Sequence, residues 1–352
     1  MKILIIHNEY REAGGEDEVV NSEVELLKSF GHQVKVLKRS NLELDNLPLL
    51  GKVRFLFNNA RFSEPVYRTV KDMIRAEKPD IAHIHNTFFV ISPSVYFALY
   101  EEGVPVLQTL HNYRFICPKG IFYRKAKICM RCQNGKYFWG IIFACWRNSQ
   151  FATLMLARII RKMIKDNVFK EKIKGYIALS DFSKKIFVQN GFNSENIFVK
   201  PNFVNDTGNY PAEFNGDYVL FVGRIVDYKG IKSLIAAIKK LPDIKFMVIG
   251  DGPMFKELSR LCLMHKNLNL TGRLANDKTI ESIKKSRFVV FPSECHETFG
   301  KVVIEAFSCG KPVIVSDLEN MREIVRDREN GVLFEAGNSA DLAAKIQWAW
   351  DN

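Results

Sequence analysis

Long apolar runs are missing from this chain of 352 residues. None approaches the roughly 18–20 residues that cross a bilayer, so we expect no membrane-spanning helix. The first segment, Lys2–Ile6, is too short for the core of a signal peptide and is typical of a buried strand, so we expect an intracellular protein. The seven cysteines are an odd number in a large chain without an export signal, which argues against a disulfide framework.

Acidic residues are scarce in one long stretch, because residues 114–185 contain 17 basic and only 3 acidic side chains. Residues 1–205 carry 31 Lys and Arg against 19 Asp and Glu, whereas residues 206–352 carry 20 of each, so the net charge of +12 lies in the first part. Such an asymmetry indicates an anionic partner for one domain: a membrane, a nucleic acid or a phosphorylated substrate. The alternative is a solvated basic surface.

Short apolar segments alternate with segments of helical periodicity in both halves of the chain. The composition, 47% hydrophobic and 26% charged, supports a folded core. The predicted strands are Lys2–Ile6, Gln33–Leu37, Ile81–His85, Val104–Thr109, Tyr176–Leu179, Ile197–Lys200, Tyr218–Val222, Lys245–Ile249, Leu268–Thr271, Phe288–Phe291 and Pro312–Ser316. This alternation predicts an α/β protein of two tandem Rossmann-like, doubly wound domains with a cleft between them.

A segment rich in Pro, Asn, Gly and Asp, 201–216, separates the two series and places the domain boundary after residue 205. The N-terminal domain then spans residues 1–205 and the C-terminal domain residues 206–352. Residues 113–150 interrupt the alternation with a basic insertion, and a long basic helix is predicted over 151–174.

The insertion holds the cysteines Cys117, Cys129, Cys132 and Cys145. The Cys-x2-Cys pair in the middle suits a tetrahedral thiolate site, which the outer two cysteines could complete. We expect a structural zinc site or, less favoured, an iron–sulfur cluster; the alternative is four thiols in a reducing compartment.

The C-terminal half contains a pair of glutamates beside a strand end. Glu297 follows the strand Phe288–Phe291, and ligands bind at the carboxyl ends of strands in such sheets. The backbone of Phe299 and Gly300 then forms a helix N-terminus suited to a phosphate or sugar oxygen. Glu305, eight residues after Glu297, would reach vicinal hydroxyls. The alternative is two solvated helix carboxylates.

Cations follow two other strands of the same half. Arg224 and Lys229 lie in one strand-to-helix loop, and a departing diphosphate needs such positive charge. Arg273 follows a further strand. The alternative for each is a surface cation. The turn Gly250-Asp251-Gly252-Pro253 is interpreted as structural.

In the N-terminal half, Gly14 and Gly15 lie between the first strand and the first helix, where missing Cβ atoms allow a ligand to approach the backbone. The pattern is no GxGxxG, so a nicotinamide-binding fingerprint is absent. His111 and His85 each follow a strand and are expected at the carboxyl end of the sheet.

Together these motifs resemble family 4 retaining glycosyltransferases of the two-domain GT-B fold. The resemblance covers nearly the whole chain and rests, in order, on Gly14-Gly15, His111, Pro201-Asn202, Gly223-Arg224, Lys229-Gly230, Gly250-Asp251-Gly252-Pro253, Thr271-Gly272-Arg273, Glu297 and Glu305. The family usually has a further helix, beyond Ser339–Trp350, that crosses back onto the first domain.

The resemblance implies that the C-terminal domain binds a nucleotide-sugar donor and the N-terminal domain the acceptor. The diphosphate is implied to contact Gly14, Gly15, Arg224 and Lys229, with Arg273 near the base or the diphosphate. The donor sugar is implied to contact Glu297, Thr298, Phe299 and Gly300, and the ribose hydroxyls to contact Glu305. His111 and Glu297 are the implied catalytic residues. No cofactor is implied for catalysis, because cationic side chains take the place of a divalent metal.

We therefore expect a hexosyltransferase that moves a sugar from a UDP- or GDP-linked donor to a glycan or lipid-linked glycan during cell-surface polysaccharide assembly. The basic, aromatic stretch 114–185 favours a cytoplasmic enzyme on the anionic inner face of the membrane. The alternatives are a nucleotide-sugar epimerase of similar fold and a basic nucleic-acid-binding protein. The sequence contains no recognised nucleic-acid-binding motif, so no nucleic-acid partner is expected.

Overall fold

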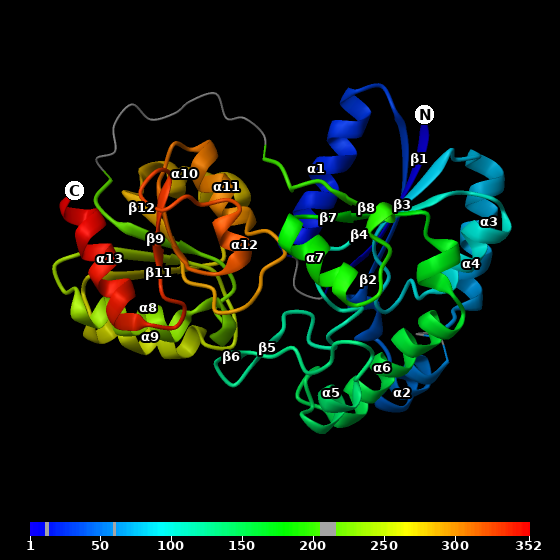
Figure 1. Ribbon diagram of the computed structural model, residues 1–352, viewed down its shortest axis with the longest axis horizontal. Helices are drawn as coiled ribbons and strands as arrows, with labels where there is room; N and C mark the ends of the chain where they lie inside the picture. The colour runs from blue at the N-terminus through cyan, green and yellow to red at the C-terminus, as the bar shows by residue number, and fades with distance from the viewer. Residues whose placement is uncertain (11–13, 59–60, 205–215) are drawn as a thin grey trace. The chain divides into compact units, whose positions relative to one another are not determined.

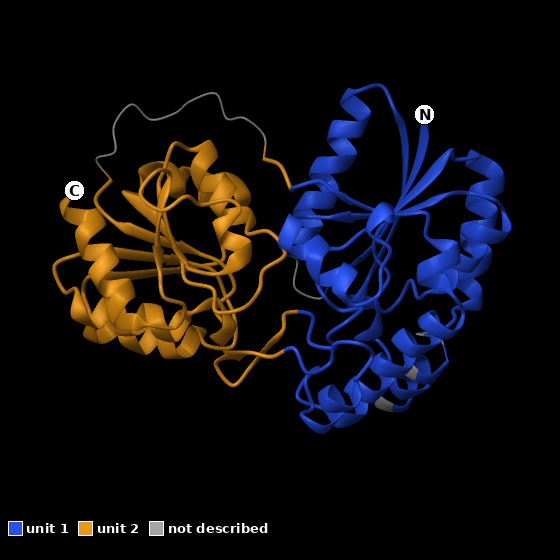
Figure 2. Ribbon diagram, in the orientation of Figure 1, with its two compact units in different colours: residues 1–120, 130–201 blue, residues 121–129, 202–352 orange. Residues whose placement is uncertain are grey.

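The computed structural model describes residues 1–10, 14–58, 61–204 and 216–352. The chain divides into two units (Figure 2): unit 1 comprises residues 1–120 and 130–201, and unit 2 comprises residues 121–129 and 202–352. Each unit contains a parallel sheet of six strands, which confirms the predicted α/β class. The predicted boundary after residue 205 falls in the segment 205–215, which lies outside the described residues.

Unit 1 has the strand order β2-β1-β3-β4-β7-β8 (Figure 1). Its strands are β1 (Lys2–Glu9), β2 (Gln33–Ser40), β3 (Ile81–Asn86), β4 (Val106–Thr109), β7 (Gly175–Ala178) and β8 (Ile197–Val199). Its α-helices are α1 (Gly15–Ser29), α2 (Leu49–Phe57), α3 (Glu64–Glu77), α4 (Ser94–Glu101), α5 (Phe138–Ile142), α6 (Gln150–Lys165) and α7 (Asp181–Gln189). Short helical turns are η1 (Asn41–Leu44), η2 (Val168–Lys172) and η3 (Ser194–Asn196).

The first strand and helix show why this order forms. Residues 3–8 of β1 are all buried, as expected for a parallel strand whose two faces are both covered. Val20 and Val24 of α1 lie on one side of the helix and pack against Ile3 and Ile5 of the strand. Burial of these side chains fixes the helix on the sheet and brings the start of α1 to the carboxyl end of β1.

Unit 2 has the strand order β11-β10-β9-β12-β13-β14. Its strands are β5 (Tyr123–Arg124), β6 (Lys127–Ile128), β9 (Val219–Val222), β10 (Phe246–Ile249), β11 (Leu268–Gly272), β12 (Phe288–Phe291), β13 (Val313–Ser316) and β14 (Gly331–Phe334). Its helices are η4 (Asp227–Lys229), α8 (Ile231–Lys240), α9 (Phe255–Met264), α10 (Asn276–Lys285), α11 (Lys301–Ser308), α12 (Glu319–Arg322) and α13 (Ser339–Asp351). This is the Rossmann order, in which the chain reverses direction across the sheet between β9 and β12.

Two hydrophobic cores lie on the two faces of the unit 2 sheet. Val219 and Phe221 of β9 pack in the core formed with α8, α9 and α13, whereas Leu220 between them packs in the core formed with α10, α11 and α12. Successive side chains of a strand point to opposite faces, so an unbroken apolar strand supplies both cores. The loops at the carboxyl end of this sheet are therefore held by packing on both sides.

The helix predicted over 151–174 is confirmed as α6, but its predicted end is wrong, because α6 ends at Lys165 and Asn167 adopts a left-handed conformation with φ 52° before the turn η2. The strand β14, the helices α2 and α5 and the hairpin of β5 and β6 were not predicted. None of the described helices is long and apolar enough to cross a membrane.

Candidate active site

The loops that follow β9 and β12 approach each other closely at the backbone, where the Glu294 N–H also donates to the Tyr228 carbonyl at 2.9 Å. Gly230, which begins α8, has φ 73°, and a Cβ atom built on it would lie 1.8 Å from the carbonyl oxygen of Pro292. No other residue fits in this space, so glycine lets the two loops approach. The contact brings Lys229, in one loop, beside the residues that follow Pro292 in the other.

Glu297 is held by groups from both loops. The Lys229 Nζ lies 2.6 Å from the Glu297 Oε1, and the Ser293 hydroxyl donates to the same oxygen at 2.8 Å. The Asn320 side chain donates to the Glu297 backbone carbonyl at 2.9 Å. The side chains of Lys229 and Glu297 are only 20% and 19% exposed, so this glutamate is no solvated helix carboxylate.

The ion pair keeps Lys229 charged despite its burial. Burial opposes the ammonium form, but the adjacent Glu297 carboxylate holds the pKa of Lys229 above its usual value. Burial raises the pKa of Tyr228, and the positive charges of Lys229 and Arg224 oppose that rise.

The second glutamate lies on α11, which starts immediately after Gly300. Glu305 is buried, and its Oε1 lies 3.0 Å from the Nζ of Lys301, one helical turn earlier. Phe299 is buried below the helix start. The sequence therefore placed Glu297 and Glu305 correctly on either side of the start of a helix, and neither is the solvated charge of the alternative interpretation.

The remaining predicted cations are less enclosed. Arg224 and Arg273 are exposed and follow β9 and β11, respectively. The turn at Gly250 is structural, as interpreted, because a Cβ atom there would lie 1.9 Å from the carbonyl oxygen of Gly223. The backbone N–H of Ile225 also donates to the Asp251 carbonyl at 2.9 Å, which ties the β10–α9 loop to the β9 loop.

Sequence reasoning missed a tyrosine in unit 2 that comes from an early part of the chain. The Tyr123 hydroxyl, on the hairpin of β5 and β6, lies 3.1 Å from Asp227 Oδ2 and 3.3 Å from Glu294 Oε2. Burial and these two carboxylates raise the pKa of Tyr123 well above its usual value, so the phenol keeps its proton. No spacing in the sequence indicates this long-range contact.

In unit 1, His111 follows β4 and helps to line a small hollow with residues after β3, among them Asn86 and Phe88. Its Nε2 lies 2.9 Å from the Nδ1 of His85. Burial, together with neighbouring positive charge, lowers the pKa of His111 to about 3 and that of His85 well below its usual value. Both imidazoles are therefore neutral at physiological pH.

The glycines of the first loop lie at the start of α1. An added Cβ atom on Gly14 would meet nothing within 4 Å, so packing alone does not require glycine there. The backbone N–H of Gly14 donates to Asp17 Oδ2 at 2.7 Å, and Asp17 Oδ1 lies 2.7 Å from His7 Nε2. The start of α1, where Gly15 is the first residue, is thus anchored to the end of β1.

The predicted cysteine site divides between the two units. Cys129 belongs to unit 2, whereas the other three belong to unit 1. Within unit 1, Cys132 Sγ and the backbone N–H of Cys145 both lie against Gly140. The zinc site stays a prediction.

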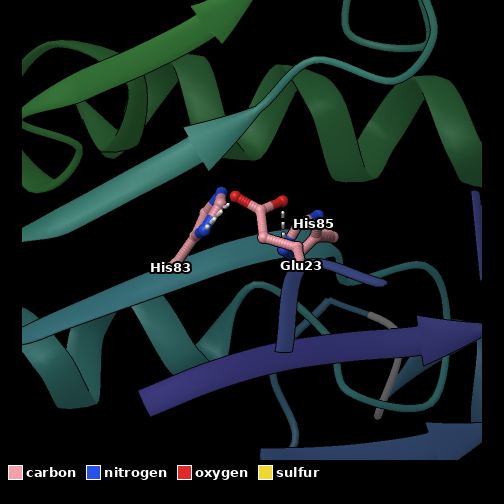
Figure 3. Close-up of side chains that lie close together, drawn as sticks. All are labelled: Glu23, His83 and His85. Atoms are coloured by element: carbon pink, nitrogen blue, oxygen red, sulfur yellow. Dashed lines mark ion pairs between the residues drawn. The ribbon is translucent and has the colours of Figure 1, made fainter. Parts of the chain in front are cut away.

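Two further buried groups in unit 1 were not foreseen. Burial raises the pKa of the Glu16 carboxyl, near Tyr10 and Arg114, to about 8. Glu23 on α1 faces the side chains of His83 and His85 on β3 (Figure 3). Of the described residues, these three are the only set of histidine, cysteine or acidic side chains placed to hold a metal ion. Glu23 is some 60 residues from His83 and His85 in the sequence, so only folding brings them together.

Two family models match this chain and together cover nearly all of it. Residues 13–207 match Glycosyltransferase Family 4, and residues 209–352 match Glycosyl transferases group 1. The chain belongs to glycosyltransferase family 4. The enzyme is therefore a glycosyltransferase, and its two Rossmann-like domains are those of the GT-B fold.

Individual relatives agree with this assignment. An uncharacterised glycosyltransferase of Methanocaldococcus jannaschii is 30% identical over 87% of this chain and 74% of its own length. A phosphatidyl-myo-inositol mannosyltransferase of Mycolicibacterium smegmatis is 24% identical over 95% of this chain and 80% of its own. The fold of Anabaena HepE in complex with UDP-glucose matches with a TM-score of 0.67 at 20% identity, covering 100% of this chain and 90% of that one.

The neutral His111 predicts a specific pH dependence of stability. Above about pH 6.5 the imidazole is neutral in both the folded and the unfolded chain and has no effect. At lower pH the unfolded chain binds a proton that the folded chain does not, so the folded state loses stability as the pH falls toward the folded pKa of about 3. His111→Gln should remove part of this loss, up to about 1.4 kcal/mol per pH unit for one proton.

The measurement is the free energy of unfolding from urea titrations between about pH 6 and pH 4. The matched variant His265→Gln, in unit 2, controls for the removal of a histidine elsewhere. An unchanged slope in His111→Gln would show that this imidazole titrates normally in the folded enzyme.

Proposed function

We propose that the enzyme is a retaining hexosyltransferase that transfers a sugar from a nucleotide-diphosphate sugar to a glycan or lipid-linked glycan acceptor in cell-surface polysaccharide assembly. The observation that carries this proposal is the pairing of Lys229 with Glu297 beside the start of α11, with Glu305 buried on the same helix. A nucleotide-sugar donor is supported by the related fold of HepE, whose complex contains UDP-glucose.

Each member of the unit 2 cluster has a role in this reaction. As the bond from the anomeric carbon to the diphosphate breaks, negative charge grows on the leaving phosphate, and Lys229 and Arg224 are the cations that offset it. The acceptor hydroxyl forms the new bond on the same face of the sugar, and its proton passes to the leaving phosphate. Before this step, binding of the donor moves Lys229 from Glu297 to the diphosphate, and the freed Glu297 carboxylate orients the donor sugar.

The structure of the loop predicts the effect of removing its buried cation. Lys229→Ala should lower kcat/KM by roughly 10²–10³, as removal of one transition-state donor does in other enzymes. Steady-state kinetics with UDP- and GDP-sugars measure this effect. Lys232→Ala is the matched control, because Lys232 is only three residues further along, at the start of α8, but is 66% exposed and pairs with Asp227. Turnover of Lys229→Ala equal to that of the control would remove Lys229 from the diphosphate site.

The buried Glu305 predicts a defect in nucleotide binding. If its carboxylate accepts the ribose hydroxyls, Glu305→Gln should weaken binding of the free nucleoside diphosphate by about 10- to 100-fold, the effect of losing a hydrogen bond to a charged group. Calorimetry with UDP and GDP measures this, with Glu281→Gln on the exposed face of α10 as control. Affinity equal to that of the control would leave Glu305 only as the partner of Lys301.

We also propose that unit 1 binds an anionic membrane surface. Exposed apolar side chains gather on α2, α5 and α6; they are Leu50, Phe57, Phe138, Ile142, Phe151 and Ile164. The rings of Phe57 and Phe151 lie 5.7 Å apart, and α5 packs against α6, so the three helices share one surface. Arg158 and Lys165 follow Phe151 along α6 at intervals of seven residues, so the three exposed side chains lie on one side of the helix. Cations among apolar side chains are typical of a surface that lies on a bilayer.

Charge reversal tests this surface. Arg158→Glu with Lys165→Glu should weaken binding to vesicles of phosphatidylglycerol by about tenfold or more, because each cation near an anionic surface contributes roughly 1 kcal/mol. Lys162 is the poorer target, since its Nζ lies 2.6 Å from Asp166. The control is Lys239→Glu with Lys240→Glu on α8, which changes the net charge equally.

Co-sedimentation at low and high salt measures the binding, and donor affinity should not change in either variant. Equal binding to phosphatidylcholine and phosphatidylglycerol vesicles, or equal loss in both double variants, would contradict a membrane surface on α6.

A further inference from the structure

A His-x-His pair lies at the centre of the unit 1 sheet. His83 and His85 are two residues apart on β3, so their side chains point to the same face of the sheet, with ring centroids 4.2 Å apart. The strand lies between β1 and β4, and α1 covers this face, so both rings are at least 95% buried. Glu23, on α1, is also buried and directs its carboxylate toward both rings (Figure 3).

The distances among these groups are close to those of a metal site. The Glu23 Oε1 lies 3.6 Å from the His83 Nδ1, and its Oε2 lies 3.9 Å from the His85 Nε2. One ligand atom from each of the three residues can be chosen so that all lie within 4.8 Å of one another. Two ligands about 2.1 Å from a tetrahedral zinc ion lie about 3.4 Å apart. The two distances from Glu23 to the histidines need to shorten by only a few tenths of an ångström to reach this value.

The outer nitrogens of both rings are already engaged. The His83 Nε2 lies 2.7 Å from the Thr109 hydroxyl, and the His85 Nδ1 lies 2.9 Å from the His111 Nε2. Hydrogen bonds of this kind fix the tautomer of metal-binding histidines and leave the inner nitrogen as the ligand. The inner nitrogen of His85, Nε2, is buried and has no hydrogen-bond partner in the described part of the chain. A buried nitrogen in this state requires an explanation.

We propose that Glu23, His83 and His85 bind one divalent transition-metal ion, with zinc the best fit to two imidazoles and one carboxylate. Such a donor set suits zinc, copper, iron or nickel better than magnesium or calcium. This site is separate from the four cysteines of the insertion and from the donor-binding loops of unit 2.

Lys200 is the group that competes with the metal. Its Nζ lies 3.2 Å from the Glu23 Oε1, and its side chain is 43% exposed, so it can move away when an ion binds the carboxylate. Without a metal, this ammonium is the charge that offsets the buried Glu23. Metal binding and the Lys200 ion pair are therefore alternative states of one site.

A metal here would determine the proton arrangement of His111, a consequence that rests on the proposed function. An ion on the His85 Nε2 leaves the ring proton on Nδ1, which then donates to the His111 Nε2. The proton of the neutral His111 must in that case reside on Nδ1. The ion would thus hold His111 in one tautomer, whereas the metal-free pair can adopt two.

Titration of the wild-type enzyme with Co²⁺, after removal of bound metal by a chelator and without donor or acceptor, tests the proposal. We expect one Co²⁺ per chain with the visible bands of nitrogen and oxygen ligands, whereas any further ion with a thiolate charge-transfer band would belong to the four cysteines. Glu23→Gln and His85→Gln should each weaken binding by at least about tenfold. Lys200→Met should tighten it several-fold, because the competing cation is gone.

His265→Gln, in unit 2, is the control for adventitious binding to a histidine and should bind as the wild type does. Lys200→Met removes a side chain near the surface, so it tests the site even where a buried-ligand variant fails to fold. The proposal is overturned by an absence of the Co²⁺ bands of nitrogen and oxygen ligands in the wild type, or by Glu23→Gln and Lys200→Met that both bind as the control does. None of these results depends on sugar transfer, so they do not bear on the proposed function.

Discussion

The backbone of Gly230 passes so close to the Pro292 carbonyl that no side chain could lie between them. This contact sets the separation of two loops that leave the sheet on either side of its switch point. Lys229 and Glu297 meet because their backbones are held there, and the ion pair between them forms in a site that is largely closed to water. The positions of Ser293 and of the start of α11 follow from the same contact.

The two units use buried charge in opposite ways. In unit 2, the positive side chains after β9 lie beside carboxylates, and Lys229 keeps its proton although it is buried. In unit 1, the histidines at the ends of β3 and β4 lose theirs, because burial disfavours a charged ring. On the proposed function, the paired Lys229 exchanges its carboxylate for a phosphate, whereas neutral imidazoles can donate or accept hydrogen bonds without repelling a ligand.

Much of this could be predicted from the sequence, because the relevant signals are local. Apolar runs such as Phe288–Phe291 identify strands that are buried on both faces. Glu297 and Glu305 lie only eight residues apart, just before and just after the start of α11, so local sequence is enough to place them. β14 was missed because its four residues follow a charged turn and carry little periodicity. Glu23 and Tyr123 could not be found this way, since each meets partners that are distant in sequence. The end of α6 depends on the left-handed conformation of Asn167, which no apolar pattern reveals.

The hairpin of β5 and β6 changes how the chain can be divided. Because residues 121–129 belong to unit 2, the polypeptide passes between the units three times, near residues 120, 129 and 201. A protease that cuts only between residues 202 and 216 would give two polypeptides, and residues 121–129, which belong to unit 2, would stay covalently attached to the fragment that contains unit 1. A recombinant fragment that begins at residue 202 would lack the Tyr123 hydroxyl, and Asp227 and Glu294 would lose a shared donor. The order of the chain thus makes the second unit dependent on a segment synthesised well before the rest of it.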